Sequence, residues 1–145
     1  MISFESFKTE DGTPIYQQIL DYIKRGAVSG AIQNGDELPS RRVLSALLGI
    51  NPNTVQKAFR LLEEEGLIES RAGSGSVMTL SDERTAQIRA ELLADDIRSI
   101  TGALKRTGIG RDEALQLIAR YWDEPLGEAE PGSPAAGPSP QEVTP

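Results

Sequence analysis

The connector between two short helical patterns constrains the fold most, because it leaves no room for a free loop. Gly49 ends the first pattern, and Asn51 starts the second after a single intervening residue. Asn51 is a good helix N-cap, and Pro52 suits the first helical position because the N–H that proline lacks has no intrahelical partner there. We therefore expect one helix to end and the next to begin almost at once.

Each of these two helices carries one apolar face. The first is about ten residues long, begins near Pro39 or Ser40, and is expected to turn Leu44, Leu47 and Leu48 inward. The second has apolar residues at the i, i+3, i+4 and i+7 spacing of a buried stripe, namely Val55, Ala58, Phe59 and Leu62.

Residues 67–80 predict two short strands around a glycine-rich turn, directly after the second helix ends at Gly66. A short helix, a tight turn, a second helix and a β-hairpin together predict a winged helix-turn-helix. In this fold the second helix enters the major groove of DNA, and residues near its N-terminus reach the base edges. The predicted fold class is therefore mostly α with a small β wing, over residues 1–80.

The first 38 residues are expected to complete this domain. Alternating apolar and polar side chains in residues 2–7 predict a short strand. A helix is expected over residues 14–29, with Thr13 as its N-cap and Gly30 at its end. Ile32 and Leu38 are expected in the core.

Residues 81–124 predict two helices with more apolar surface than they can bury against each other. Ser81 is a good N-cap for the first, and Gly108 separates it from the second. Ile88 and Leu92 are expected to widen the apolar stripe of the first helix. We expect both helices to hold two chains together as a homodimer. The residues expected in this interface are Ala90, Leu93, Ile97, Ile100, Leu104, Leu115, Ile118 and Trp122.

Composition excludes several classes of protein. The chain has no cysteine and no histidine, which removes disulfides, thiolate nucleophiles, imidazole bases and the usual zinc ligands. No apolar run approaches the roughly 20 residues that span a bilayer, and the N-terminus lacks the features of a signal peptide. We expect a cytoplasmic protein that is not an enzyme, contacts no membrane and uses no metal or cofactor. The acidic runs Glu63–Glu65 and Asp95-Asp96 are expected on solvated helix faces. Residues 125–145, with six of the nine prolines, are expected to be a disordered tail.

Residues 39–60, which we call the basic segment, stand out in an acidic chain. They contain four basic side chains and no acidic one, so they contribute +4 to a net charge of −7 and leave −11 on the rest of the chain. Asn and Gln can form paired hydrogen bonds with adenine and Arg with guanine, while Lys and Arg also bind phosphates. The residues expected to contact DNA, from this segment and the wing, are Ser40, Arg41, Arg42, Asn51, Asn53, Thr54, Gln56, Lys57, Arg60, Arg71, Gly73 and Ser74.

Two other interpretations remain open at this point. The basic segment could be a pair of solvated helix faces, or the winged helix could serve for protein contacts without reading DNA. The glycine-rich turn in residues 71–76 does not fit a phosphate-binding P-loop, because no Lys-Ser or Lys-Thr pair follows the glycines and no helix begins there.

Residues 14–78 resemble the DNA-binding domain of the GntR family of bacterial transcription regulators. The markers are Gly35-Asp36, the run Leu38-Pro39-Ser40-Arg41-Arg42, Thr54-Val55, Gly66-Leu67-Ile68 and the glycines at 73 and 75. The stretch NPNTVQKA, residues 51–58, and the short C-terminal part with two helices are similar to the YtrA subfamily.

The resemblance implies a dimeric, sequence-specific regulator, in most cases a repressor, that binds an inverted-repeat operator. In this subfamily the C-terminal helices form the dimer and are too small to enclose a large effector pocket, so whether a small-molecule effector exists is left open. Relatives commonly govern transporter operons. The resemblance also implies that Arg42 is the DNA-contacting arginine of its helix and that Gly73 lies at the wing tip. It places the recognition-helix contacts at Asn53, Thr54, Gln56 and Lys57.

Overall fold

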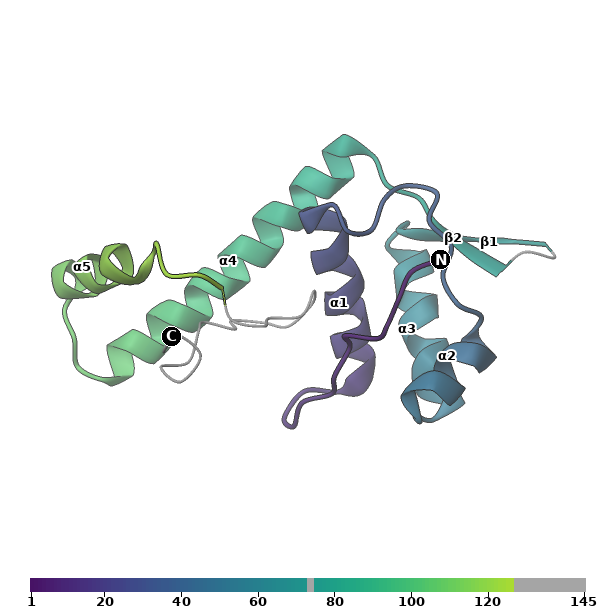
Figure 1. The fold of residues 1–145 in the computed structure, drawn as a ribbon, viewed down its shortest axis with the longest axis horizontal. Coiled ribbons are helices and arrows are strands. Elements are labelled where there is room, and N and C mark those ends of the chain that lie inside the picture. The colour runs from purple at the N-terminus through teal and green to yellow at the C-terminus, as the bar shows by residue number, and fades with distance from the viewer. Residues whose placement is uncertain (73–74, 127–145) are drawn as a thin grey trace.

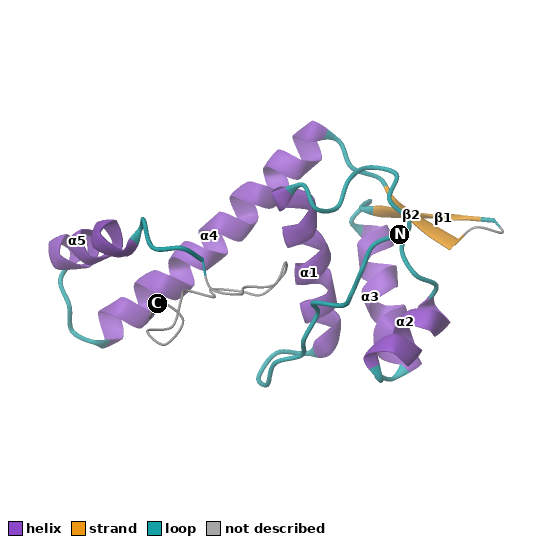
Figure 2. Ribbon diagram, viewed as in Figure 1, coloured by secondary structure: helices purple, strands orange, loops and turns teal. Residues whose placement is uncertain are grey.

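The computed structural model describes residues 1–72 and 75–126. Within them lie five α-helices and one antiparallel pair of strands. The elements are α1 Ile15–Ser29, α2 Arg41–Leu48, α3 Pro52–Glu64, β1 Ile68–Arg71, β2 Gly75–Met78, α4 Asp82–Arg106 and α5 Arg111–Tyr121. In Figure 1, α1, α2, α3 and the hairpin form one unit, and α4 passes beside α1 and runs away from it toward α5. The fold is mostly α with a small β-hairpin, as predicted (Figure 2).

The turn between α2 and α3 is built by short polar side chains. The N–H of Val43 donates to the Ser40 hydroxyl at 3.2 Å, which caps α2. Gly49 ends the helix with a φ of 64°, a left-handed conformation that glycine adopts without steric cost. The Asn51 side chain then accepts from the N–H of Asn53 at 2.8 Å, with Pro52 at the first helical position. These caps confirm the predicted helix boundaries on both sides of the turn.

The core of the winged helix-turn-helix lies where α1, α2 and α3 meet. The predicted stripe of α3 is buried, and Phe59 is only 1% exposed. Ile19 and Ile23 from α1 and Leu44 from α2 complete the centre of this core. Ile32 and Leu38 are also buried, as predicted. Burial of a side chain of this size contributes about 1.5–3 kcal/mol each, so this cluster is the main source of stability for the domain.

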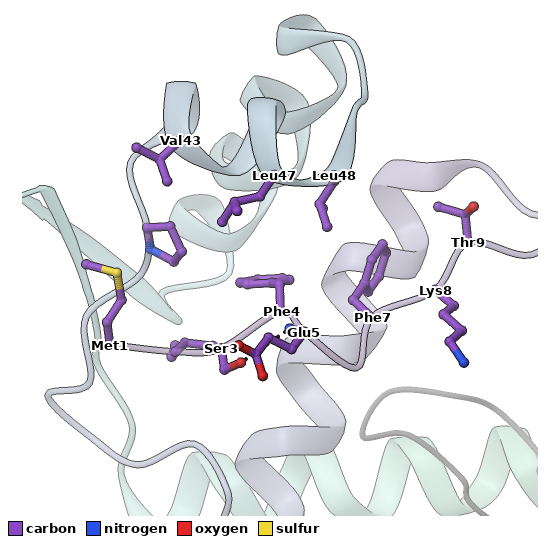
Figure 3. Close-up of a pocket in the computed structure, with 12 residues that line it drawn as sticks. Met1, Ser3, Phe4, Glu5, Phe7, Lys8, Thr9, Val43, Leu47 and Leu48 are labelled. Carbon is purple, nitrogen blue, oxygen red and sulfur yellow. Dashed lines mark hydrogen bonds between the residues drawn. The ribbon is translucent and has the colours of Figure 1, made fainter.

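Leu47 does not face inward, and that prediction is wrong. Its side chain is 67% exposed, whereas Ser45 is buried beside Leu44. At about 100° per residue, Leu47 lies about 110° from the centre of the face that Leu44, Ser45 and Leu48 share. Ser45 tolerates burial because its hydroxyl donates to the Ile50 carbonyl at 2.6 Å. Leu47 instead lines a groove of about 820 Å³ between α2 and the N-terminal segment (Figure 3).

Residues 2–7 form no strand, contrary to the prediction. Ile2 and Phe4 are buried, but the one backbone-to-backbone hydrogen bond from this stretch to another described segment runs from the Ile2 N–H to the Glu37 carbonyl at 2.7 Å. The chain then turns, with the N–H of Phe7 donating to Phe4 at 3.0 Å, so that both rings pack against Tyr22 at 5.0 and 5.4 Å. Aromatic packing on α1 therefore replaces strand pairing.

Helix α1 begins one residue later than expected. Pro14, not Thr13, is the N-cap residue, and no side chain caps the helix. The Gln18 amide organises this end instead, donating to the carbonyls of Thr13 at 2.7 Å and Glu10 at 2.8 Å. Gly30 ends the helix in a left-handed conformation, as predicted.

Helix α4 presents different residues to the domain and to the solvent. Ser81 caps it as predicted, accepting from the N–H of Arg84 at 3.0 Å. Ile88 is 1% exposed and joins the core of the winged helix-turn-helix, with Leu92 packed beside it. The expectation that Ile88 and Leu92 widen the apolar stripe of the dimer interface is therefore wrong. The cause is the packing of α4 against α1, which covers this side of the helix.

The residues expected in the dimer interface are mostly uncovered in the single chain. On α4, Leu93, Ile97 and Ile100 are 45, 58 and 39% exposed. Ala90 is exposed as well, and Leu104 is half-buried. On α5, Leu115 and Ile118 are exposed, as is Trp122 at its C-cap, and the helix buries none of its residues. The predicted tail over residues 125–145 lies outside the described residues beyond position 126.

Candidate nucleic-acid interface

The outer side of α3 presents polar and basic side chains to the solvent. Asn53, Gln56, Lys57 and Arg60 are exposed, and Thr54 is half-buried. These residues occupy the first two to three turns of a helix whose other side is buried in the core. The arrangement separates the apolar stripe from the polar face, as a recognition helix requires.

The two neighbouring arginines of α2 have different surroundings. The Arg41 Nη2 donates to Glu63 Oε1 at 3.0 Å, and its guanidinium carbon lies 5.2 Å from the centre of the Phe59 ring. The side chain therefore packs against α3. Arg42 is exposed, and within the described part of the chain it forms no hydrogen bond or ion pair. Arg42 is the cation of α2 that is available to a ligand.

The acidic run Glu63–Glu65 at the end of α3 is exposed to solvent, as expected, and two of its carboxylates also form ion pairs with other elements. Glu63 also accepts from the Ser70 hydroxyl at 2.8 Å, so it links α2, α3 and β1. Glu65 pairs with Lys24 at 2.9 Å and with Arg84 at 3.5 Å. Local sequence contains no signal for the ion pairs, because Lys24, Arg41 and Arg84 lie on other elements, far from these carboxylates along the chain.

The remaining cations of the interface are held loosely. The Lys57 ammonium lies 4.0 Å above the Tyr16 ring of α1, an interaction that orients the side chain and leaves it exposed. Arg60 pairs with Glu64 at 3.9 Å, and Arg71 on β1 pairs with Glu69 at 3.9 Å. Such exposed pairs contribute about 0–1 kcal/mol. A phosphate group can therefore replace the carboxylate at little cost.

The other predicted contacts differ in what the structure says of them. The side chains of Ser40 and Asn51 are occupied as helix caps, which fixes the starts of α2 and α3. Gly73 and Ser74 lie outside the described residues. The strands that flank them pair from Ile68 with Met78 to Arg71 with Gly75, so the hairpin expected for the wing is formed.

Among residues 1–72 and 75–126, no group of three or more acidic, histidine or cysteine side chains could hold a metal ion. No helix in those ranges is long and apolar enough to cross a membrane.

Comparison with known proteins agrees with this geometry. Residues 15–78 match the family described as "Bacterial regulatory proteins, gntR family". The HTH-type transcriptional repressor YtrA of Bacillus subtilis is 45% identical over 67 residues, which are 46% of this chain and 52% of that protein. The match to YtrA thus spans about half of its length. An uncharacterized HTH-type transcriptional regulator of the same organism, YhcF, is 29% identical over 77% of this chain and 93% of its own.

A solved structure extends the likeness to the C-terminal helices. A GntR family transcriptional regulator from Listeria monocytogenes superposes with a TM-score of 0.68 and 29% identity, over 77% of this chain and 98% of that chain. A coverage of this size reaches beyond residue 78 into α4 and α5. The winged helix-turn-helix with its two C-terminal helices is thus a fold that GntR regulators share. Residues 15–78 of the chain therefore carry the DNA-binding domain of the GntR family of bacterial transcriptional regulators.

Proposed function

We propose that this chain is a homodimer that binds an inverted-repeat operator and represses transcription from it. The observation that carries the proposal is the exposed polar face of α3 together with Arg42 of α2. This surface lies within a basic segment that contains no acidic residue, in a chain whose net charge is −7. Because the rest of the chain is acidic, non-specific attraction to DNA is weak, and binding depends on this one surface.

In the proposed complex, α3 lies in the major groove with its N-terminal half toward the bases. Asn53 and Gln56 have amide side chains that can pair with the edge of adenine, and the exposed Arg42 can read guanine or hold a phosphate. Lys57 and Arg60 are one and two turns from Asn53 on the same side of the helix, and we assign them to phosphates. Arg71 on the wing is assigned to the neighbouring backbone.

The homodimer is supported by the exposed apolar residues of α4 and α5. Apolar side chains of this size and number are costly to leave in water on a single small chain. A two-fold symmetric pair would bury the same surface of both copies. It would place the two α3 helices in successive major grooves about 34 Å apart, which corresponds to an inverted repeat.

Repression is supported by one relative, since YtrA of Bacillus subtilis is a transcriptional repressor. A dimer bound over a promoter would block RNA polymerase by occupancy. The proposal places the protein in the cytoplasm, where its DNA lies. A transporter operon is the regulated target that we propose, as the resemblance implies.

The proposal is tested by titrating the full-length chain into labelled DNA from its own upstream region, with unrelated DNA of equal length as competitor. We expect a complex that survives excess unrelated DNA. Asn53→Ala combined with Gln56→Ala should remove this preference and leave weak, salt-sensitive binding. Equal affinity of the wild-type chain for both DNAs would contradict the proposal and favour a module for protein contacts.

A further inference from the structure

An ion-pair cluster of three side chains joins the DNA-binding domain to α4. The Arg25 guanidinium of α1 donates from Nη1 and Nη2 to the two carboxylate oxygens of Asp96 at 2.9 and 2.7 Å. Its Nε donates to Asp21, one turn earlier on α1, at 2.9 Å. A planar guanidinium paired with both oxygens of a carboxylate fixes distance and orientation together.

The cluster is partly shielded from water. The three side chains are 18 to 28% exposed. The hydrogen bonds to Asp96 and Asp21 raise the pKa of Arg25 above its ordinary value, while burial raises the pKa of Asp21 against the opposing effect of Arg25. The ion pairs that Arg25 forms with Asp21 and Asp96 are therefore less screened by solvent than pairs at an open surface.

Helix α4 contacts the domain through one regular stripe. Arg84, Ile88, Leu92 and Asp96 follow each other at intervals of four residues, so they lie on one side of the helix. Ile88 is buried in the domain core, and Arg84 pairs with Glu65. Asp96 is the last of the four and directly precedes Ile97. With Leu93 and Ile100, Ile97 forms the exposed apolar side of α4 that we assign to the dimer interface and call the seam. At about 100° per residue, the stripe and the seam are separated by about 130° around the same rigid helix.

We infer that the ion-pair cluster of Arg25, Asp21 and Asp96 sets the distance that the dimer accepts between its two DNA half-sites. The inference rests on the proposed function, because it needs a dimer that reads an inverted repeat. One helix carries both the dimer seam and the docking stripe, so the angle between them determines where each α3 stands. These residues are positioning residues and do not touch DNA.

The pitch of DNA makes this angle decisive. One added base pair moves a half-site by about 3.4 Å along the duplex and turns it by about 34–36° around the axis. A domain fixed at both ends of its stripe cannot follow such a change. Without Asp96, α4 is held by Arg84, Ile88 and Leu92 in its N-terminal half, and the domain can pivot relative to the seam.

The test uses inverted repeats that differ only in spacer length, in steps of one base pair. We expect the wild-type chain to bind the best spacer at least about tenfold more tightly than spacers one base pair longer or shorter. For Asp96→Ala this ratio should fall below about threefold. Affinity for a single half-site, and the dimer mass by sedimentation, should not change.

Asp95→Ala is the matched control. Asp95 is the neighbouring residue on α4, is well exposed and pairs only with Arg98 within the described residues. The substitution Asp95→Ala removes the same charge and should keep the wild-type ratio of affinities between the best spacer and its neighbours. Exchange of the partners, Arg25→Asp with Asp96→Arg, should restore the ratio, since it keeps the net charge and the pair. Asp96→Asn, which preserves shape, provides a second variant with a ratio expected between those of the wild type and Asp96→Ala.

A spacer ratio that stays at the wild-type value in both Asp96 variants would overturn the inference. So would an equal loss of spacer preference in Asp95→Ala. Failure of the proposed function would look different, because the wild-type chain itself would then bind no inverted repeat better than unrelated DNA.

Discussion

The two adjacent arginines of α2 should serve different purposes, although both were expected to contact DNA. Arg41 pairs with Glu63 at 3.0 Å and covers the Phe59 ring, whereas Arg42 is exposed without a partner in the described chain. We therefore predict that Arg41→Ala lowers the stability of the domain. Arg42→Ala should lower the affinity for DNA and leave stability unchanged.

The expected magnitudes follow from these contacts. Arg41 and Glu63 are each more than a third exposed, so solvent screening leaves the ion pair about 0.2–1 kcal/mol. The contact with Phe59 adds about 0.5–1 kcal/mol, and the buried Nε of Arg41, which has no acceptor among the described residues, offsets part of the gain. Arg41→Ala should thus cost about 1 kcal/mol of unfolding free energy. Arg42→Ala should weaken specific binding by about 1–3 kcal/mol, or reduce the salt slope by about 1 if it holds a phosphate.

Two measurements on each variant separate these roles. Urea unfolding followed by circular dichroism gives the free energy of unfolding, and fluorescence anisotropy with labelled operator at several salt concentrations gives affinity and salt slope. Unfolding of Arg42→Ala should match the wild type within about 0.5 kcal/mol. Unchanged operator affinity and salt slope in Arg42→Ala would refute the reasoning, as would an unchanged stability in Arg41→Ala.

Three further predictions concern α1 and α4. Ile88→Ala should cost about 2–5 kcal/mol of unfolding free energy because the Ile88 side chain is 1% exposed. Ile97→Ala should leave urea unfolding of the monomer unchanged, because Ile97 is exposed in the single chain. Equal costs for the two variants would contradict the division of α4 into a buried and an exposed side. Leu93→Asp should abolish dimers and operator binding with the domain still folded, and sedimentation that still shows a dimer would defeat the assignment. Burial raises the pKa of Asp21 above 3.8 against the opposing Arg25, so the folded protein holds this proton more tightly than the unfolded chain. The stability of the wild type relative to Asp21→Asn should therefore fall as the pH rises from about 3 to about 6. Urea unfolding of both proteins across this range measures the stability difference, and a difference that stays flat or rises would contradict the prediction.

The elements that the sequence predicted are those that depend on local chemistry. Asn51 caps α3, Gly49 ends α2 in a left-handed conformation, and the stripe of α3 around Phe59 is buried. Each of these features depends on side chains within a few residues of each other. The sequence therefore predicted the helix-turn-helix and the hairpin correctly.

The features that were missed depend on partners far apart in the chain. Leu47 is apolar and helical, but only the packing of α2 on α3 decides that Ser45 takes the buried place. The apolar residues of α4 look like one wide stripe, and contact with α1 divides them into a buried and an exposed part. Arg25 and Asp96 are 71 residues apart, so no periodicity relates them.

Selection of bound sequences from random DNA by the full-length chain tests the central claim most directly. The claim is that two copies present the exposed face of α3 and Arg42 to one duplex. We predict enrichment of an inverted repeat with a single spacer length and half-sites about one helical turn apart, centre to centre. Enrichment of no sequence, or of an isolated half-site with no repeat, would contradict it.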